Sequence, residues 1–163
     1  MNRVELLLNP PQRLGVADSV GAILTAGDKR YVMQERDLKP GIFFPGYLSL
    51  FGGVLEHGEQ PEQGLRRELR EELELEVDVL KPFGTVAVDW TKAGLPAAVR
   101  WYFQADISDE RLNRLKVHEG QGLRLLAPTE LFGGAAVSPI DAYALWFHIC
   151  AKHITWHNKQ GQP

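Results

Sequence analysis

The chain has 163 residues, of which 44% are hydrophobic and 24% are charged, and its formal net charge is −3. This composition excludes a collagen, a coiled coil and a disordered chain. No apolar run reaches the roughly 18 residues that a membrane-spanning helix needs, and the acidic balance offers no broad basic surface to nucleic acid. A single cysteine, Cys150, excludes an internal disulfide and a zinc site built from cysteines.

This length is typical of one domain, so we expect a single domain over residues 1–163. It would comprise an N-terminal segment (1–15), a core (16–137) and a C-terminal helix (about 138–155). The N-terminal segment has a short apolar stretch and no small-residue cleavage site, so it does not resemble a secretory signal. We therefore expect a cytoplasmic protein.

The hydrophobic periodicity predicts short strands alternating with a few helices. The first two strands should form a hairpin around a turn at Gly27-Asp28, and residues 37–46 form a loop rich in proline and glycine. The order favours a mixed sheet with helices on its faces, an α/β (α+β) fold. The predicted strands are residues 16–24, 30–36, 47–51, 77–88, 97–105 and 122–126, and the predicted helices are 61–73, 108–116, 128–132 and about 138–155.

The helix over residues 61–73 carries the most informative pattern. Pro61 suits the first turn of a helix, and leucines recur at helical spacing, which predicts a face toward the core. At about 100° per residue the side chains fall into three sectors. These are the leucines at 65, 69 and 73, the arginines at 66, 67 and 70, and the glutamates at 68, 71 and 72, with Gly64 leaving room in the last sector.

The three glutamates repel one another because residues three and four apart are neighbours on a helix. A divalent cation would remove this conflict, and carboxylates are the hard oxygen ligands that Mg²⁺ or Mn²⁺ prefers. The alternative is a solvated helix face whose charges pair as Glu62–Arg66 and Arg67–Glu71.

The segment from Gly53 to Leu75 resembles the signature of the Nudix hydrolase family. That signature is a glycine, five residues, a glutamate, seven residues, then Arg-Glu-aliphatic-x-Glu-Glu-x-Gly-aliphatic. One position departs from it, because Glu74 stands where the family usually has glycine. Six fixed positions match by chance on the order of once in 10⁷ starts. The positions that fit are Gly53, Glu59, Arg67, Glu68, Leu69, Glu71, Glu72 and Leu75.

The resemblance implies a Nudix-type α/β/α sandwich with a mixed β-sheet, and a Mg²⁺-dependent pyrophosphohydrolase, with Mn²⁺ as the alternative cation. It implies a small-molecule partner, a nucleoside diphosphate derivative whose phosphoric anhydride bond is cleaved. The charge balance and the lack of a long apolar run predict no nucleic-acid or membrane partner. A nucleoside triphosphate is slightly favoured over a nucleotide sugar or a dinucleotide. A homodimer is a further expectation, because homodimers are common among soluble proteins.

The resemblance also implies roles for individual residues. Glu72 or Glu68 would act as general base, and Arg67 and Glu59 would orient the catalytic loop. Glu119 lies in a segment similar to a loop that supplies a further acidic ligand in mutator-type members, and it is the runner-up for the base; a solvated loop acid is the alternative. The implied metal ligands are Glu68, Glu71, Glu72, Glu119 and the backbone carbonyl of Gly53.

Candidate substrate contacts lie on the segments that approach this motif. Arg36 would meet a phosphate, and Tyr47 or Phe51 would stack on a nucleobase, although core packing is the default for both rings. Gly52 would let the backbone come close to metal or phosphate.

Other features are expected to be structural. Residues Tyr143, Trp146, Phe147 and Ile149–Cys150 should form the packed face of the last helix, and Trp90 and Trp101 should be core. His153 and His157, spaced i,i+4 at or beyond the end of that helix, are expected to be exposed, and a metal site is the alternative. Two other functions on the same fold remain: a non-catalytic ligand-sensing or interaction module, and an isoprenoid diphosphate isomerase. The isomerase would need a cysteine in the site, for which Cys150 is poorly placed.

Overall fold

A computed structural model describes residues 2–9 and 14–153. Its elements in chain order are α1 (Arg3–Leu8), β1 (Ser19–Ala26), β2 (Tyr31–Glu35), β3 (Leu48–Ser49), α2 (Pro61–Leu73), β4 (Lys81–Val88), η1 (Thr91–Ala93), β5 (Ala98–Ile107), α3 (Asp109–Leu112), β6 (Gly122–Leu126), α4 (Pro128–Phe132), α5 (Pro139–Cys150) and η2 (Ala151–His153). None of these helices is long and apolar enough to span a membrane.

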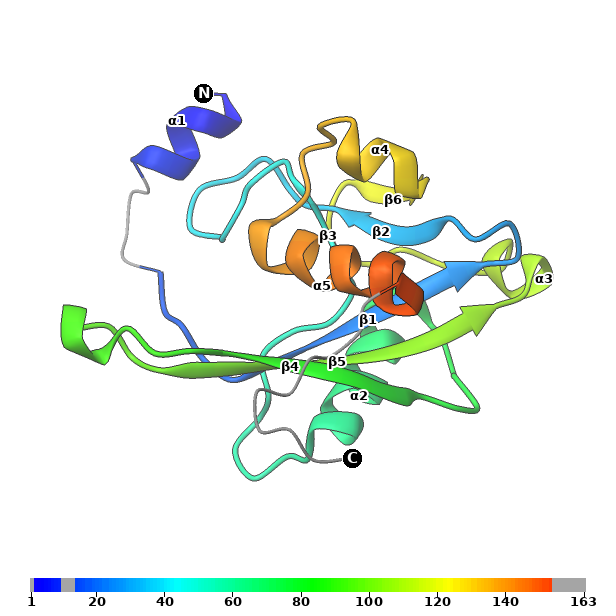
Figure 1. Ribbon diagram of the computed structural model, residues 1–163, viewed down its shortest axis with the longest axis horizontal. Coiled ribbons are helices and arrows are strands. Elements are labelled where there is room, and N and C mark those ends of the chain that lie inside the picture. Colours follow the sequence, from blue (N-terminus) through cyan, green and yellow to red (C-terminus); the bar gives the residue numbers. More distant parts are fainter. Residues whose placement is uncertain (1, 10–13, 154–163) are drawn as a thin grey trace.

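The strands form one mixed sheet, as the sequence predicts (Figure 1). The order is β3-β2-β1-β5-β4, and β6 pairs with β2. β1 and β5 run parallel, with Ser19 opposite Arg100, while the other pairs are antiparallel. The expected hairpin between β1 and β2 is present and pairs Thr25 with Tyr31.

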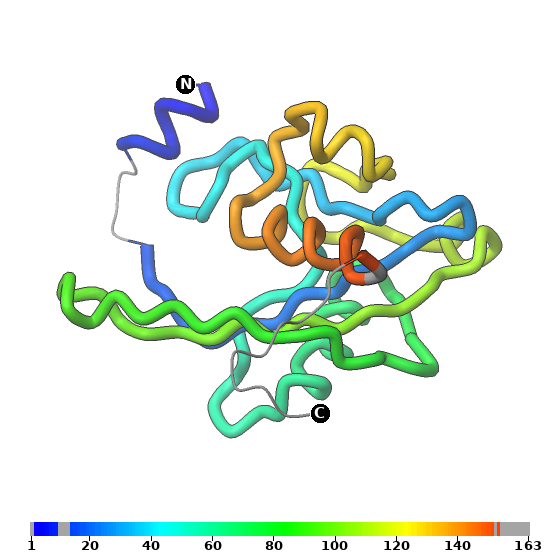
Figure 2. Tube along the Cα trace, viewed as in Figure 1, coloured from blue at the N-terminus to red at the C-terminus, as the bar shows by residue number. Residues whose placement is uncertain are grey.

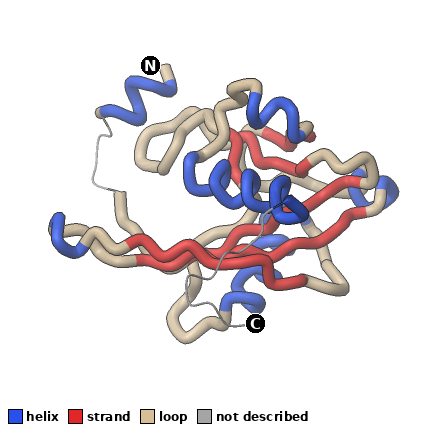
Figure 3. Tube along the Cα trace, viewed as in Figure 1, coloured by secondary structure: helices blue, strands red, loops and turns tan. Residues whose placement is uncertain are grey.

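Helices cover both faces of the sheet, which makes the predicted α/β/α sandwich (Figure 3). Successive residues of a strand point to opposite faces. Thus Val20, Ala22 and Leu24 of β1 pack with the leucines of α2, whereas Ile23 packs with Leu145 of α5. Two separate apolar clusters result, one on each side of the sheet.

Helix α2 begins at Pro61 and ends at Leu73, as predicted. Leu65, Leu69 and Leu73 are fully buried. Glu74 follows in the left-handed conformation with φ 52°, the place where a glycine would be unstrained. Its backbone N–H still bonds to the carbonyl of Arg70, so the helix ends normally without the glycine.

The N-terminal segment, to which the sequence analysis assigned no secondary structure, contains helix α1, whose start is capped by the Asn2 side chain accepting from the Glu5 N–H at 2.9 Å. The expectation that Trp90 is core is wrong. Trp90 is 60% exposed, because it precedes η1 at the end of the β4–β5 hairpin, which projects past the rest of the sheet (Figure 2). Trp101 is partly buried against the α2 cluster.

The packed face of α5 also differs from the prediction. Tyr143 and Trp146 are exposed, while Ala144, Leu145 and Asp141 are buried. The apolar residues run around the whole helix, so their spacing does not reveal which side meets the sheet.

His148 of α5 is half-buried. Its Nδ1 lies 2.8 Å from the hydroxyl of Tyr31, and its Nε2 lies 2.9 Å from Oε1 of Gln104. His153 is exposed, while residues 154–155 and His157 lie outside the described residues.

Candidate active site

The segment that follows β3 runs along the first half of β1. The N–H groups of Ala22 and Val20 donate to the carbonyls of Phe51 (2.9 Å) and Gly53 (2.8 Å). Between these two bonds Gly52 has φ +132°, and a Cβ at this position would overlap the Val20 carbonyl. Only glycine fits here, and it brings the backbone directly under α2.

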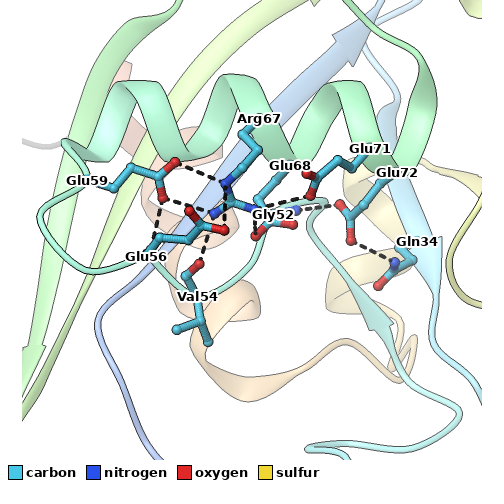
Figure 4. A network of polar contacts seen from close by, with 9 residues as sticks. All are labelled: Gln34, Gly52, Val54, Glu56, Glu59, Arg67, Glu68, Glu71 and Glu72. Carbon is cyan, nitrogen blue, oxygen red and sulfur yellow. Dashed lines mark hydrogen bonds and ion pairs between the residues drawn. The ribbon is translucent and has the colours of Figure 1, made fainter.

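Glu72 is the buried carboxylate of the site, with only 4% of its surface exposed. Its Oε2 accepts the Gly52 N–H at 2.8 Å, and its Oε1 accepts the Gln34 side-chain amide at 3.3 Å (Figure 4). Burial raises the pKa of Glu72 to about 8, against the lowering effect of the Gly52 N–H. The negative charges of Glu119 and Glu68 add to the increase.

Glu68 lies one helical turn before Glu72 and packs against Gly53. A Cβ at Gly53 would overlap the Glu68 carboxylate, so the missing side chain makes room for it. Burial raises the pKa of Glu68, while Arg67, which donates to its Oε1 at 2.9 Å, opposes the increase. The Gly53 carbonyl already accepts the Val20 N–H, which occupies one of its two lone pairs.

Arg67 holds the loop and the helix together. Its Nε and Nη2 donate to the two carboxylate oxygens of Glu59, at 3.0 and 2.9 Å, and Nη2 also reaches the Val54 carbonyl at 3.2 Å. Its Nη1 donates to Glu68 and Glu71. The bond from Arg67 lowers the pKa of Glu59, so this pair stays charged in its bidentate geometry.

Two more predicted ligands lie at the edge of the site. The Glu71 side chain is 59% exposed and accepts from Arg67 at 3.2 Å. Glu119 is exposed, its carbonyl accepts the Gln34 amide at 3.4 Å, and its charge acts on both Glu68 and Glu72. The structure therefore brings Glu119 to the glutamates of α2, although it comes from a distant loop.

In residues 2–9 and 14–153, no group of three or more His, Cys, Asp or Glu side chains is arranged to hold a metal ion. The donors nevertheless fit a hard divalent cation, because they are all oxygens. Of the two inner carboxylates, Glu68 lies close enough to Glu72 to raise the pKa of Glu72. Gly53, which has no side chain, lets the Glu68 carboxylate lie against its backbone.

The predicted substrate contacts fare differently. Phe51 takes the core packing that was its default, since its ring is fully buried in the cluster under α2, and its candidate role in stacking on a nucleobase is therefore wrong. Gly52 binds Glu72 through its N–H. Arg36 and Tyr47 do not contact the glutamates: Arg36 donates to the Phe43 carbonyl at 2.8 Å, and the Tyr47 ring lies under the guanidinium of Arg3.

Sequence reasoning assigned no role to Gln34 and Ser49. Both are buried, and the Ser49 hydroxyl donates to Gln34 Oε1 at 3.1 Å, which leaves the Gln34 amide group directed at Glu72. The sequence did contain a signal for Gln34. Side chains two apart in a strand point to the same face, so Gln34 lies on the face of β2 where Val32 is part of the core.

A comparison with protein families matches residues 15–145 to the family model described as "NUDIX domain". The nucleoside triphosphatase NudI from Enterobacter sp. (strain 638) is 52% identical over 42 residues, which is 24% of this chain and 30% of that protein. The match thus spans less than a third of the relative's length.

Solved structures show the same fold at low sequence identity. The MutT protein from Methanosarcina mazei Go1 has a TM-score of 0.66 at 16% identity, covering 87% of this chain and 97% of that one. The E. coli ORF135 protein gives 0.65 at 23%, covering 91% and 96%. The NUDIX domain of Shewanella oneidensis NrtR, complexed with ADP ribose, gives 0.64 at 18%, covering 94% and 100%. Since the family model matches well over half of its length, the chain belongs to the Nudix family.

Proposed function

We propose that the chain is a divalent-cation-dependent hydrolase that cleaves the phosphoric anhydride bond of a nucleoside diphosphate derivative. The observation that carries this proposal is the environment of Glu72. It is a nearly buried carboxylate whose partners among the described residues are an uncharged backbone N–H and an amide, with Glu68 and Glu119 nearby. Burying a carboxylate without a cationic partner is costly, and a bound cation offsets this cost.

The proposed cation is Mg²⁺, with Mn²⁺ as the alternative. When bound, such a cation neutralises phosphate oxygens and lowers the pKa of a water molecule. Phosphoryl transfer depends mainly on such charge neutralisation and on positioning. The chain's own contribution is geometric: Gly52 and Gln34 fix Glu72, and Arg67 fixes Glu68 and Glu59.

We assign the cation to Glu68, Glu71, Glu72 and Glu119 with the Gly53 carbonyl. General-base catalysis is assigned to Glu72 or Glu68, with Glu119 as runner-up. Two observations support the place of Glu119 in this set. Its backbone is held near the site by the hydrogen bond from Gln34, and its side chain is exposed and can turn toward a cation.

The favoured substrate is a nucleoside triphosphate, with a nucleotide sugar or a dinucleotide as alternatives. The partial relative described as a nucleoside triphosphatase supports this order. The match to this relative covers only 24% of the chain. A panel of substrates is therefore needed to identify the nucleobase and the leaving group.

The test is a panel of nucleoside triphosphates, nucleotide sugars and dinucleotides with Mg²⁺ or Mn²⁺, scored for released phosphate, pyrophosphate or monophosphate. We expect turnover that EDTA abolishes and that Glu72→Gln lowers by orders of magnitude. The matched control is Glu62→Gln, on the same helix but in an exposed ion pair with Arg66; it should retain activity. Wild-type turnover in folded Glu72→Gln would overturn the assignment.

The second candidate function is a non-catalytic ligand-sensing or interaction module. It is favoured by one fold neighbour, the NrtR domain complexed with ADP ribose. Saturable nucleotide binding by the folded chain, without turnover of any panel member, would select it over the hydrolase.

The proposal includes one domain, a cytoplasmic location and a two-fold dimer, the commonest oligomeric form. Light scattering that returns the monomer mass of 18.3 kDa would contradict the dimer, and cell fractionation tests the location.

A further inference from the structure

A cavity of about 310 Å³ lies away from the α2 leucines, at the end of β2. Its wall comes from segments far apart in the sequence: helix α1, the end of β2, the start of β3, and the segment through β6. The lining residues are Arg3, Glu35, Arg36, Gly46, Leu48, Gln121, Arg124 and Ala136.

Three arginines and one acidic residue, Glu35, line this wall. In residues 2–9 and 14–153, no carboxylate lies within ion-pair distance of Arg3 or Arg36; the ion pair of Arg124 is with Glu130, outside the wall, at 2.6 Å. The like charges gathered on this wall repel one another, and a bound anion would offset that repulsion.

The arginines are held in place by contacts that leave donors free. Arg36 uses Nε on the Phe43 carbonyl, so both of its terminal amino groups remain. The Arg3 guanidinium lies over the Tyr47 ring, 5.2 Å from its centroid. The Cβ of Arg3 also lies close to Gly46, 3.5 Å from the position that a Cβ would take there. Helix α1, which the family match does not include, thus contributes Arg3 to the cavity wall.

The cavity also adjoins the loop that carries Glu119. Gln121 donates its N–H to the Glu35 carbonyl at 2.7 Å and its side-chain amide to the Arg36 carbonyl at 2.8 Å. Two residues earlier in this loop, the Glu119 carbonyl accepts from Gln34. The loop from Glu119 to Gln121 therefore lies beside both the cavity and the glutamates.

We propose that this cavity is a phosphate-binding site formed by Arg3, Arg36 and Arg124. Guanidinium groups present paired N–H donors that match phosphate oxygens. The phosphate is either free in solution or part of a nucleotide substrate, remote from the bond that is cleaved.

The test is titration of the full chain with inorganic phosphate, followed by ³¹P NMR and calorimetry in EDTA without divalent cations. Under these conditions the glutamates repel phosphate, so binding reports on the arginines. Arg3→Gln and Arg124→Gln should each weaken binding at least about tenfold. The matched control, Arg114→Gln, removes an exposed arginine paired with Glu110 outside the cavity and should bind as the wild type does.

Absence of phosphate binding by the wild type, or equal binding by all three variants, overturns the proposal. The source of the phosphate follows from steady-state kinetics in phosphate-free buffer with Mg²⁺. A raised KM with unchanged kcat in Arg3→Gln identifies a substrate phosphate, and an unchanged KM identifies free phosphate. The binding experiment does not depend on the proposed hydrolysis, so either can fail alone.

Discussion

The backbone N–H of Gly52 and the carboxylate of Glu72 meet at 2.8 Å beneath helix α2. This contact joins the loop after β3 to the buried glutamate of the site. It depends on a backbone conformation, φ +132°, that leaves no space for a side chain. The position of the glutamate is therefore set by a residue that has no functional group of its own.

Replacing Gly52 by Ala should destabilise the protein by roughly 3 kcal/mol, because the strained φ adds to overlap with the Val20 carbonyl. Urea denaturation of both proteins measures this. The control is Gly58→Ala, which has φ +79° but open space around its Cβ and should cost only about 1 kcal/mol. Equal losses would show that the close approach contributes nothing.

Replacing Gly53 by Ala should weaken cation binding at least about tenfold while changing stability little. The new methyl group meets the end of the flexible Glu68 side chain, which can rotate away from it. Calorimetric titration with Mn²⁺ measures the affinity, and Gly84→Ala, with nothing near its Cβ, is the control. An unchanged Mn²⁺ affinity would remove Glu68 from the proposed ligands.

The raised pKa of Glu72 predicts how stability depends on pH in EDTA. Its pKa is about 8 in the folded chain against an ordinary value of 4.5, so between these values the folded state keeps a proton that the unfolded state has lost. The contribution to the free energy of unfolding is complete below about pH 4.5 and is lost as the pH rises through about 8.

Denaturation in EDTA across this range should show that decline for the wild type and a flatter profile for Glu72→Gln. Saturating Mg²⁺ should raise stability most at the upper end of the range, where the carboxylate is ionised. Parallel profiles for the wild type and the variant would contradict the assignment to Glu72.

Replacing Glu74 by Gly restores the residue that the family usually has, and should raise the thermal midpoint by a few degrees in high salt. The change relieves a left-handed backbone at φ 52° but removes exposed ion pairs with Lys116 and His118, at 2.8 and 2.9 Å. Salt screens those pairs and not the backbone strain. Calorimetry at two salt concentrations measures both effects, and a gain that shrinks in salt would contradict this reasoning.

The sequence predicts α2 and its leucine face because the relevant signals are local: Pro61 starts the helix, and the leucines repeat at helical spacing. It also predicts which glutamates share a sector. It does not predict that burial differs so strongly among them, from 4% exposure of Glu72 to 59% exposure of the Glu71 side chain, because that difference depends on how the Gly52 loop packs.

The rest depends on contacts between distant segments. The parallel pairing of β1 with β5 and the approach of Gln34 to Glu72 join residues that no local pattern relates. The face of α5 is ambiguous for a further reason: a buried acid, Asp141, lies on the packed side while aromatic residues face outward. Its partner, Arg100, is 41 residues away in sequence.

This pair gives the last prediction. Asp141 Oδ1 lies 3.2 Å from both Nε and Nη2 of Arg100, and its Oδ2 accepts from the Ser138 hydroxyl at 2.6 Å and the Leu50 N–H at 3.2 Å. Asp141→Asn leaves the arginine buried without a counter-charge, which should cost about 3–5 kcal/mol. Adding Arg100→Met removes the unpaired charge and should recover part of the loss. Urea denaturation of the single and double variants measures this coupling, and strictly additive losses would show that the two charges do not depend on each other.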